Sequence, residues 1–161
     1  MIALQLAKAA GARVIATSSS DDKLKQVVAL GADETVNYKT TPEWGAHVRQ
    51  AFGGADHVVE VGGTGTLGQS FAALAPAGEI AMIGVLSQGD PPDPRGLMMT
   101  GGSLRGIFVG SVAMADRLNR FVDEHRISPA IGARFSFEEA DKAYAHAWGP
   151  DSFAKTVIEL G

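Results

Sequence analysis

The sequence predicts an α/β fold with a doubly wound, mostly parallel sheet, on three observations. Short apolar runs alternate with segments of helical periodicity along the whole chain. The runs are separated by helices of about ten residues, as right-handed crossovers between parallel strands require. The 161 residues are 45 % hydrophobic and include 20 glycines, which predicts one globular domain around one main core.

The chain opens inside a helix. Ile2, Leu6 and Ala10 repeat at helical spacing from the first residue, and neither a cap nor a strand stands before them. In an alternating α/β chain a strand should precede this helix. We therefore expect the sheet to lack the element that comes first.

Six segments predict strands, because each is short and carries apolar, β-branched residues. The run HVVEV at 57–61 is almost continuously apolar, as in a parallel strand that is covered on both faces. Polar, proline-bearing residues 87–95 predict a surface loop. The expected strands are 12–17, 34–38, 57–61, 79–86, 103–110 and 155–160.

Helices are expected between these strands. The helix after the first strand stops at Gly31, and Ser19 and Asp22 stand in capping-box relation at its start. Thr41 and Pro42 predict the cap and first turn of the next helix. The other expected helices are 67–74, 114–125 and 137–148.

Composition excludes several classes of partner and site. A formal charge of −4 without a basic run argues against a nucleic-acid groove, which needs clustered Lys and Arg. The absence of cysteine excludes disulfides and thiolate zinc sites. The chain start has no basic region and is interrupted by Lys8, so neither secretion nor a membrane span is expected. A reducing cytoplasm is the expected compartment.

Residues 63–68, GTGTLG, fit the dinucleotide fingerprint G-x-G-x-x-G between a strand and a helix. The fingerprint needs an acid at the tip of the next strand for the ribose, where this chain has Gly84 and Val85. Residues 60–65, EVGGTG, also resemble the first motif of S-adenosylmethionine methyltransferases, which needs the same acid. A third interpretation is a glycine turn that lets strand and helix pack closely.

Seven short motifs follow one another in a specific order: 5–15 (QLAKAAGARVI), 30–33 (LGAD), 37–38 (NY), 58–62 (VVEVG), 78–80 (GEI), 83–84 (IG) and 155–158 (KTVI). In this order they resemble the medium-chain dehydrogenase/reductase family, in its alcohol dehydrogenase and quinone oxidoreductase branches. The resemblance implies a Rossmann-type sheet that lacks its first strand and glycine loop, which family members carry upstream of Met1. It also implies a nucleotide-binding domain over 1–111, and C-terminal helices and a strand over 112–161 that pack back on the substrate domain.

The tip of the first expected strand, 18–23 (SSSDDK), is where such a domain meets the adenosine ribose. NAD-dependent members of the family place an Asp where this chain has Ser18. Ser18 and Ser19 leave room for a 2′-phosphate. The nearby Lys23 supplies a positive charge that attracts it. Tyr38 matches a tyrosine beside the same phosphate in NADP-using quinone reductases. The resemblance therefore favours NADP(H) over NAD(H), against the alternatives of a solvated lysine and a half-buried strand tyrosine.

Other cofactor positions follow from the same resemblance. Lys155 matches a basic position that reaches the pyrophosphate in some relatives, although a surface lysine is the alternative. The positions that line the nicotinamide half of the cofactor through backbone contacts are Val61, Gly62, Gly84, Val85, Phe108, Val109 and Gly110.

The resemblance implies that the chain is the cofactor-binding portion of an NADP(H)-dependent oxidoreductase. In such an enzyme, hydride passes between nicotinamide C4 and a carbonyl, alcohol or enone. We expect no catalytic residue and no metal site in the chain, because the family's zinc ligands or proton-relay residues lie upstream of Met1. The chain alone is therefore expected to be inactive. The four histidines have no metal-ligand spacing: His47, His57, His125 and His146.

Residues 103–110 resemble the strand by which dimeric relatives join two sheets, and an open apolar edge favours pairing. We expect a homodimer through this strand. The alternative to an enzyme is an assembly module that keeps the dimer strand and binds no nucleotide. Without the central family strand, the strands at 13–17 and 57–61 lose their shared neighbour, so we expect either direct closure between them or a gap.

Overall fold

The computed structural model describes all of residues 1–161, which form two compact units. The first unit combines Met1–Thr35 with Val112–Gly161, and the second is Val36–Ser111. Each unit has its own cluster of buried apolar side chains, so the expectation of one main core is wrong. The expected boundary after residue 111 is also where the second unit ends. The assignment of 1–111 to one nucleotide-binding domain stays a prediction.

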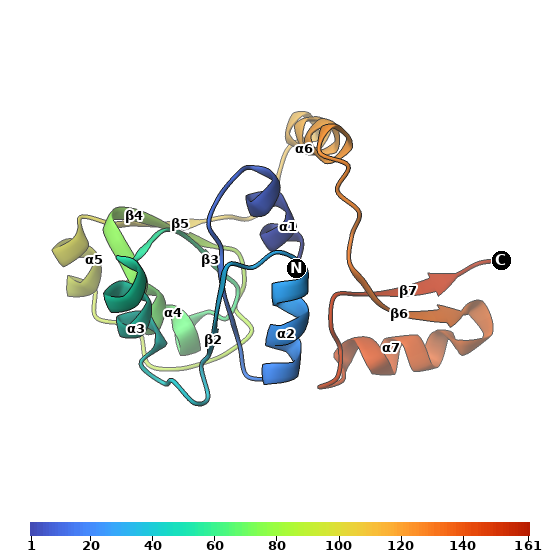
Figure 1. The fold of residues 1–161 in the computed structure, drawn as a ribbon, viewed down its shortest axis with the longest axis horizontal. Helices are drawn as coiled ribbons and strands as arrows, with labels where there is room; N and C mark the ends of the chain where they lie inside the picture. The colour runs from blue at the N-terminus through green and yellow to red at the C-terminus, as the bar shows by residue number, and fades with distance from the viewer. The chain divides into compact units, whose positions relative to one another are not determined.

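The first unit carries the elements from both ends of the chain (Figure 1). They are α1 (Ile2–Ala9), β1 (Ile15–Ser18), α2 (Asp21–Ala29), α6 (Val112–Glu124), β6 (Ile131–Ser136), the 3-10 helix η1 (Phe137–Glu139), α7 (Ala140–Trp148) and β7 (Lys155–Glu159). Leu4, Leu24, Val27 and Ala32 form its core, and Phe153 packs against them from the C-terminal segment. Long-range apolar contact therefore holds the two ends of the chain together.

A small parallel sheet, β6 with β7, lies in the C-terminal part of this unit. Its two strands pair from Ala133 opposite Thr156 to Ser136 opposite Glu159, and α7 connects them and packs against both. Figure 1 shows this strand-helix-strand arrangement near the C-terminus. β6 was not among the expected strands, because glycine and arginine interrupt its apolar run and its identity depends on pairing with β7.

The second unit is built around a three-stranded parallel sheet in the order β3-β4-β5. Its elements are α3 (Trp44–Phe52), β3 (Ala55–Glu60), α4 (Thr64–Ala73), β4 (Leu74–Met82), α5 (Arg95–Thr100) and β5 (Ser103–Gly106). The core consists of Leu67, Phe71, Leu74 and Ile80, of which Leu74 and Ile80 have no exposed surface. The parallel register brings the carboxyl ends of β3, β4 and β5 to one edge of the sheet.

The α/β fold with parallel strands is confirmed, but the strands form three sheets. β1 and β2 (Glu34–Asn37) make a two-stranded sheet of their own. β3 has β4 as its only neighbour, and no other segment is inserted beside it. Of the two expected outcomes for the missing central strand, direct closure of β1 on β3 is wrong, since the two strands belong to different sheets.

Several predicted boundaries in the second unit are wrong. α4 begins at Thr64 and runs directly into β4, which starts at Leu74 and ends at Met82 instead of spanning 79–86. β5 ends at Gly106, so 107–110 is not strand. These shifts arise because the pairing between neighbouring strands, rather than the length of an apolar run, decides where a strand ends.

Helix starts also differ from the expectations. The N-cap of α2 is Ser20, whose hydroxyl oxygen accepts the Lys23 backbone N–H, so the Ser19–Asp22 capping box is wrong. The N-cap of α3 is Glu43, not Thr41. α5 lies beyond the expected loop and was not anticipated. No helix of the structure combines the length and apolar character that crossing a membrane would need.

β3 is not covered on both faces as its apolar run suggested. Val59 is 50 % exposed, whereas Glu60 at the end of the strand is 4 % exposed. A carboxylate rather than an aliphatic side chain thus occupies the buried position where β3 leaves the sheet.

Candidate functional site

The carboxylate of Glu60 organises the turn between β3 and α4. One of its oxygens, Oε1, accepts the backbone N–H of Gly62 at 2.7 Å and that of Gly63 at 3.1 Å. The same oxygen accepts the Thr66 hydroxyl at 2.7 Å, and Oε2 accepts the hydroxyl of Ser70. Four donors therefore satisfy a carboxylate that is almost completely buried, as burial of a charged group requires.

This arrangement distinguishes the three interpretations of the glycine-rich turn. Two of its backbone N–H groups already bind the Glu60 carboxylate, so a phosphate placed against the turn would meet a buried negative charge. Gly63 has a φ of +90°, and a Cβ there would lie 2.9 Å from the Cα of Val85. The geometry supports the glycine turn for close packing over a phosphate-binding fingerprint or a methyltransferase motif.

The loop after β4 is joined to the same turn by hydrogen bonds. The Gly62 carbonyl accepts the Ser87 backbone N–H at 2.6 Å and the Ser87 hydroxyl at 2.8 Å. The backbone carbonyl of Glu60 accepts the N–H groups of Ile83 and Gly84 at 2.9 and 3.2 Å. The ends of β3 and β4 are thus held as one backbone platform.

An open apolar pocket lies at the carboxyl ends of β4 and β5. Its volume is about 440 Å³, and its lining is Met82, Ile83, Gly84, Val85, Gly106, Ile107 and Phe108. In open α/β sheets, ligands bind at the carboxyl ends of the strands. The pocket therefore lies where this fold class binds small molecules.

The structure brings together five of the predicted site residues in this unit. Gly84, Val85 and Phe108 line the pocket. Val61 and Gly62 belong to the adjoining turn, and a Cβ on Gly84 would lie 2.3 Å from the Val61 carbonyl oxygen. The contact is too close for any residue except glycine at position 84.

Three further predicted residues of the second unit lie outside the pocket lining. Val109 and Gly110 come directly after the pocket-lining Phe108 in the sequence, and both are exposed, Val109 to 75 %. Tyr38 directly follows β2 and is 41 % exposed.

Two of the predicted residues of the first unit, Ser18 and Lys23, lie at the end of β1 and in the first turn of α2. The hydroxyl oxygen of Ser18 accepts the Ser20 N–H at 3.3 Å. The Lys23 ammonium donates to the carbonyls of Pro150 at 2.6 Å and Ser152 at 2.8 Å. Two of the three ammonium N–H groups are thus used by the loop between α7 and β7, which leaves one for a ligand.

Ser19 and Lys155 complete the predicted set in this unit. Ser19 lies between β1 and the N-cap of α2 and is half-buried. Lys155 is exposed at the start of β7. Sequence reasoning did not anticipate the contacts of Lys23, because their acceptors lie 127 and 129 residues away along the chain.

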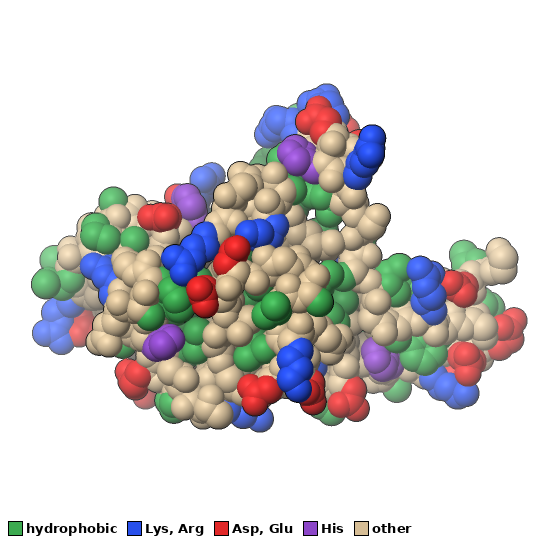
Figure 2. Space-filling model, in the orientation of Figure 1, with side chains coloured by type: hydrophobic (Ala, Val, Ile, Leu, Met, Phe, Trp, Pro, Cys, Tyr) green, Lys and Arg blue, Asp and Glu red, His purple; other side chains and the backbone are tan.

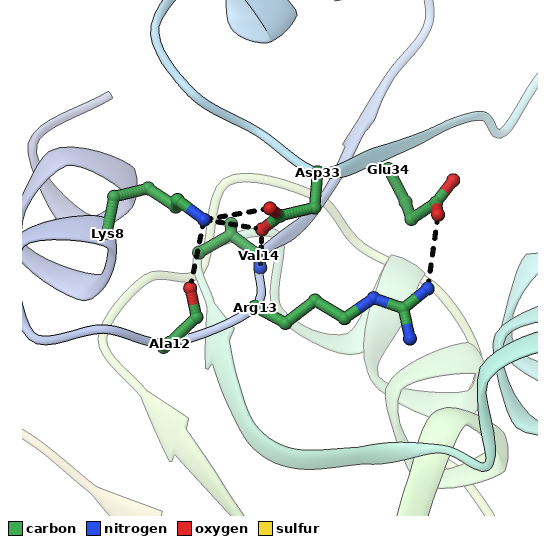
Figure 3. Close-up of polar contacts among 6 residues, drawn as sticks. All are labelled: Lys8, Ala12, Arg13, Val14, Asp33 and Glu34. Atoms are coloured by element: carbon green, nitrogen blue, oxygen red, sulfur yellow. Dashed lines mark hydrogen bonds and ion pairs between the residues drawn. The ribbon is translucent and has the colours of Figure 1, made fainter.

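Ion pairs connect the first helix and strand to the start of β2 (Figure 3). Lys8 binds Asp33, and Arg13 binds Glu34 at 3.1 Å. On the face drawn in Figure 2, basic and acidic side chains are interspersed.

Comparison with known proteins relates the chain to dehydrogenases. The sequence profile of a family described as zinc-binding dehydrogenase matches residues 1–124. A zinc-type alcohol dehydrogenase-like protein of Schizosaccharomyces pombe is 41 % identical over 98 % of this chain and 48 % of its own length. The chain spans about half the length of the curated relatives it matches.

Solved structures agree with this relationship. The structure of an NAD-dependent alcohol dehydrogenase is 36 % identical, with a TM-score of 0.84 over 99 % of this chain and 47 % of that one. A quinone oxidoreductase of Thermus thermophilus, studied also in complex with NADPH, is 30 % identical, with a TM-score of 0.76. That match covers 98 % of this chain and 53 % of the other.

The residues of this chain do not fit a zinc ion, although the description of the matching family names that metal. No group of three or more His, Cys, Asp or Glu side chains is placed to hold a metal ion, and the chain has no cysteine. His146 binds the Thr156 hydroxyl through Nδ1, and His125 stacks on Phe121. These residues therefore offer no ligand set for zinc.

Proposed function

Because this chain belongs to the zinc-binding dehydrogenase family, we propose that it is the cofactor-binding portion of an NADP(H)-dependent oxidoreductase. The reaction proposed is hydride transfer between nicotinamide C4 and a carbonyl, alcohol or conjugated enone. The cofactor supplies the hydride chemistry, while this chain binds and orients it. The family consists of NAD(P)-dependent oxidoreductases. What we propose beyond this is the preference for NADP(H) and the carbonyl, alcohol or enone substrate.

The pocket at the carboxyl ends of β4 and β5 is the observation that carries this function. A nicotinamide ring is flat, and its carboxamide needs backbone hydrogen-bonding groups beside an apolar surface. The pocket offers apolar walls from Val85 and Phe108, and the half-buried Gly84 lines it without a side chain. We assign the nicotinamide half of the cofactor to this pocket and to the adjoining Val61–Gly62 turn.

The proposed preference for NADP(H) depends on the tip of β1. No carboxylate stands at Ser18 or Ser19, where one would repel a 2′-phosphate; the nearby acids Asp21 and Asp22 temper the preference and are assigned to the first turn of α2, where they stabilise the helix dipole. The free N–H of Lys23 can donate to that phosphate while its other two hold the loop at 150–152. The related structures include both an NAD-dependent alcohol dehydrogenase and a quinone oxidoreductase in complex with NADPH.

A second proposal, compatible with the first, is homodimerisation through β5. This strand forms the edge of its sheet, and all four of its residues are exposed. Phe108 and Val109, which follow it, are 95 % and 75 % exposed. An edge strand beside exposed apolar side chains favours pairing with a second copy.

Isothermal titration of a version that carries the full cofactor-binding domain, with NADPH and with NADH, tests the proposed function. We expect NADPH to bind more tightly by about 1 to 3 kcal/mol, the contribution of one or two charge-assisted hydrogen bonds to the phosphate. Equal affinities for the two dinucleotides would contradict the NADP(H) preference. Absence of binding of either would contradict the cofactor-binding role and favour an assembly module.

A further inference from the structure

Glu60 is a buried carboxylate without a cationic partner. It is 4 % exposed, and none of the ion pairs in the structure involves it. Neutral donors alone satisfy it: two backbone N–H groups and the hydroxyls of Thr66 and Ser70. Burying a charge is expensive, and an apolar side chain would fill the same volume at lower free energy. What the carboxylate provides is therefore the geometry of the groups around it.

The group most tightly constrained by Glu60 is the backbone of Gly62. Its N–H donates to Glu60, and its carbonyl accepts two hydrogen bonds from Ser87. A Cβ on Gly62 would lie 2.2 Å from the Thr66 hydroxyl oxygen, which itself donates to Glu60. The Val61–Gly62 peptide is thus held by Glu60 at its N–H, and the next peptide, Gly62–Gly63, is held by Ser87 at its carbonyl and by Glu60 at its N–H.

The Val61–Gly62 peptide lies against a residue that lines the apolar pocket. Its carbonyl oxygen, that of Val61, lies 2.3 Å from the position that a Cβ on Gly84 would take. Ile83 and Gly84 line the pocket and also donate their N–H groups to the Glu60 backbone carbonyl. A shift of the Glu60 side chain would therefore pass to the pocket through one turn of backbone.

We propose that Glu60 is a positioning residue for the nicotinamide half of the cofactor, holding the Val61–Gly62 turn against the floor of the pocket. The inference rests on the proposed function, because it assumes that nicotinamide occupies this pocket. The Glu60 side chain does not line the pocket. Its effect is exerted through its hydrogen bonds to the backbone of the turn, while the Thr66 and Ser70 hydroxyls hold the carboxylate in place.

The test is the variant Glu60→Gln, which keeps the size of the side chain and one acceptor oxygen but removes the charge. NADPH and adenosine 2′,5′-bisphosphate are titrated into both proteins, since the second ligand carries the ribose phosphate but no nicotinamide. We expect NADPH affinity to fall about tenfold or more, as for loss of hydrogen bonds to a charged group, with the bisphosphate affinity unchanged. Glu79→Gln, on neighbouring β4 and without a hydrogen bond to the turn, is the matched control and should alter neither affinity.

Amide hydrogen exchange at Gly62 and Gly63 gives a readout that does not need the cofactor. Both amides should exchange faster in Glu60→Gln than in the wild type, and not in Glu79→Gln. If Glu60→Gln does not fold, Ser70→Ala takes its place, because it loosens the carboxylate from outside the turn and should change NADPH affinity in the same direction.

The outcomes separate the inference from the function on which it rests. A wild type that binds NADPH, with variants that lose both ligands equally or neither, would overturn the positioning role and leave the proposed function standing. A wild type that does not bind NADPH would overturn the proposed function, and with it the nicotinamide role of Glu60. Selective loss of NADPH affinity together with faster exchange would support the proposal.

Discussion

The ammonium of Lys8 lies 2.8 Å from both carboxylate oxygens of Asp33, which joins α1 to the residue before β2 (Figure 3). The same carboxylate accepts the Val14 backbone N–H at 2.6 Å, and Lys8 also donates to the Ala12 carbonyl at 3.2 Å. The Lys8 hydrogen bond, followed by that of Val14, holds the pKa of the Asp33 carboxyl below its ordinary value. One carboxylate thus connects the first helix, the approach to β1 and the start of β2.

We predict that Asp33→Asn lowers the free energy of unfolding in a pH-dependent way. Since the pKa of Asp33 is lowered by folding, its contribution is fully present above the ordinary value of 3.8 and is lost as pH falls through the lower folded-state pKa. Denaturant unfolding of both proteins between pH 7 and the acid limit measures the difference. It should be constant at neutral pH and shrink below the ordinary value, and a difference that grows with acidification would contradict the assignment.

Lys23→Ala should reduce the preference for NADPH over NADH about tenfold or more, because it removes the donor proposed to reach the 2′-phosphate. Lys25→Ala is the matched control, since it removes the same charge from the same helix, where Lys25 pairs with Asp22 at 2.8 Å. Calorimetric titration with both dinucleotides checks the prediction. An unchanged ratio in Lys23→Ala would mean that this lysine only holds the loop at 150–152.

Leu74→Ala should destabilise the second unit by about 2 to 5 kcal/mol, because it leaves a cavity at a position with no exposed surface. Val28→Ala removes apolar atoms from a side chain that is 52 % exposed and should change stability by less than about 0.5 kcal/mol. Urea unfolding monitored by circular dichroism gives both values. Similar effects for the two substitutions would show that Leu74 is not at the centre of this core.

Phe108→Asp should shift the chain from dimer to monomer, because it places a charge in the proposed interface beside β5. Phe137→Asp is the control, since Phe137 is also exposed, at 62 %, but lies in the other unit. Sedimentation velocity over a range of concentrations distinguishes the two states. A wild type that is monomeric throughout, or equal shifts in both variants, would exclude β5 as the interface.

Local patterns in the sequence were sufficient to predict the alternation of strands and helices and to identify the family. Helical spacing in α1 and the apolar run of β3 depend on residues a few positions apart, so they are legible without the fold. The predicted positions Gly84, Val85 and Phe108 were also found together at one pocket, because strands of a parallel sheet place their carboxyl ends at the same edge.

Only the tertiary structure decided how distant segments contact one another. It divided the core in two, paired β6 with β7, gave the Lys23 ammonium two carbonyls from the C-terminal loop, and placed the Glu60 carboxylate beneath the glycine turn. The physical reason is that burial, strand pairing and the donors around a charge depend on which residues meet in space, whereas periodicity records only which residues share a face of one element. Glu60 in sequence is one acid in an apolar strand, and its four hydrogen bonds arise once β3 and α4 meet at the turn.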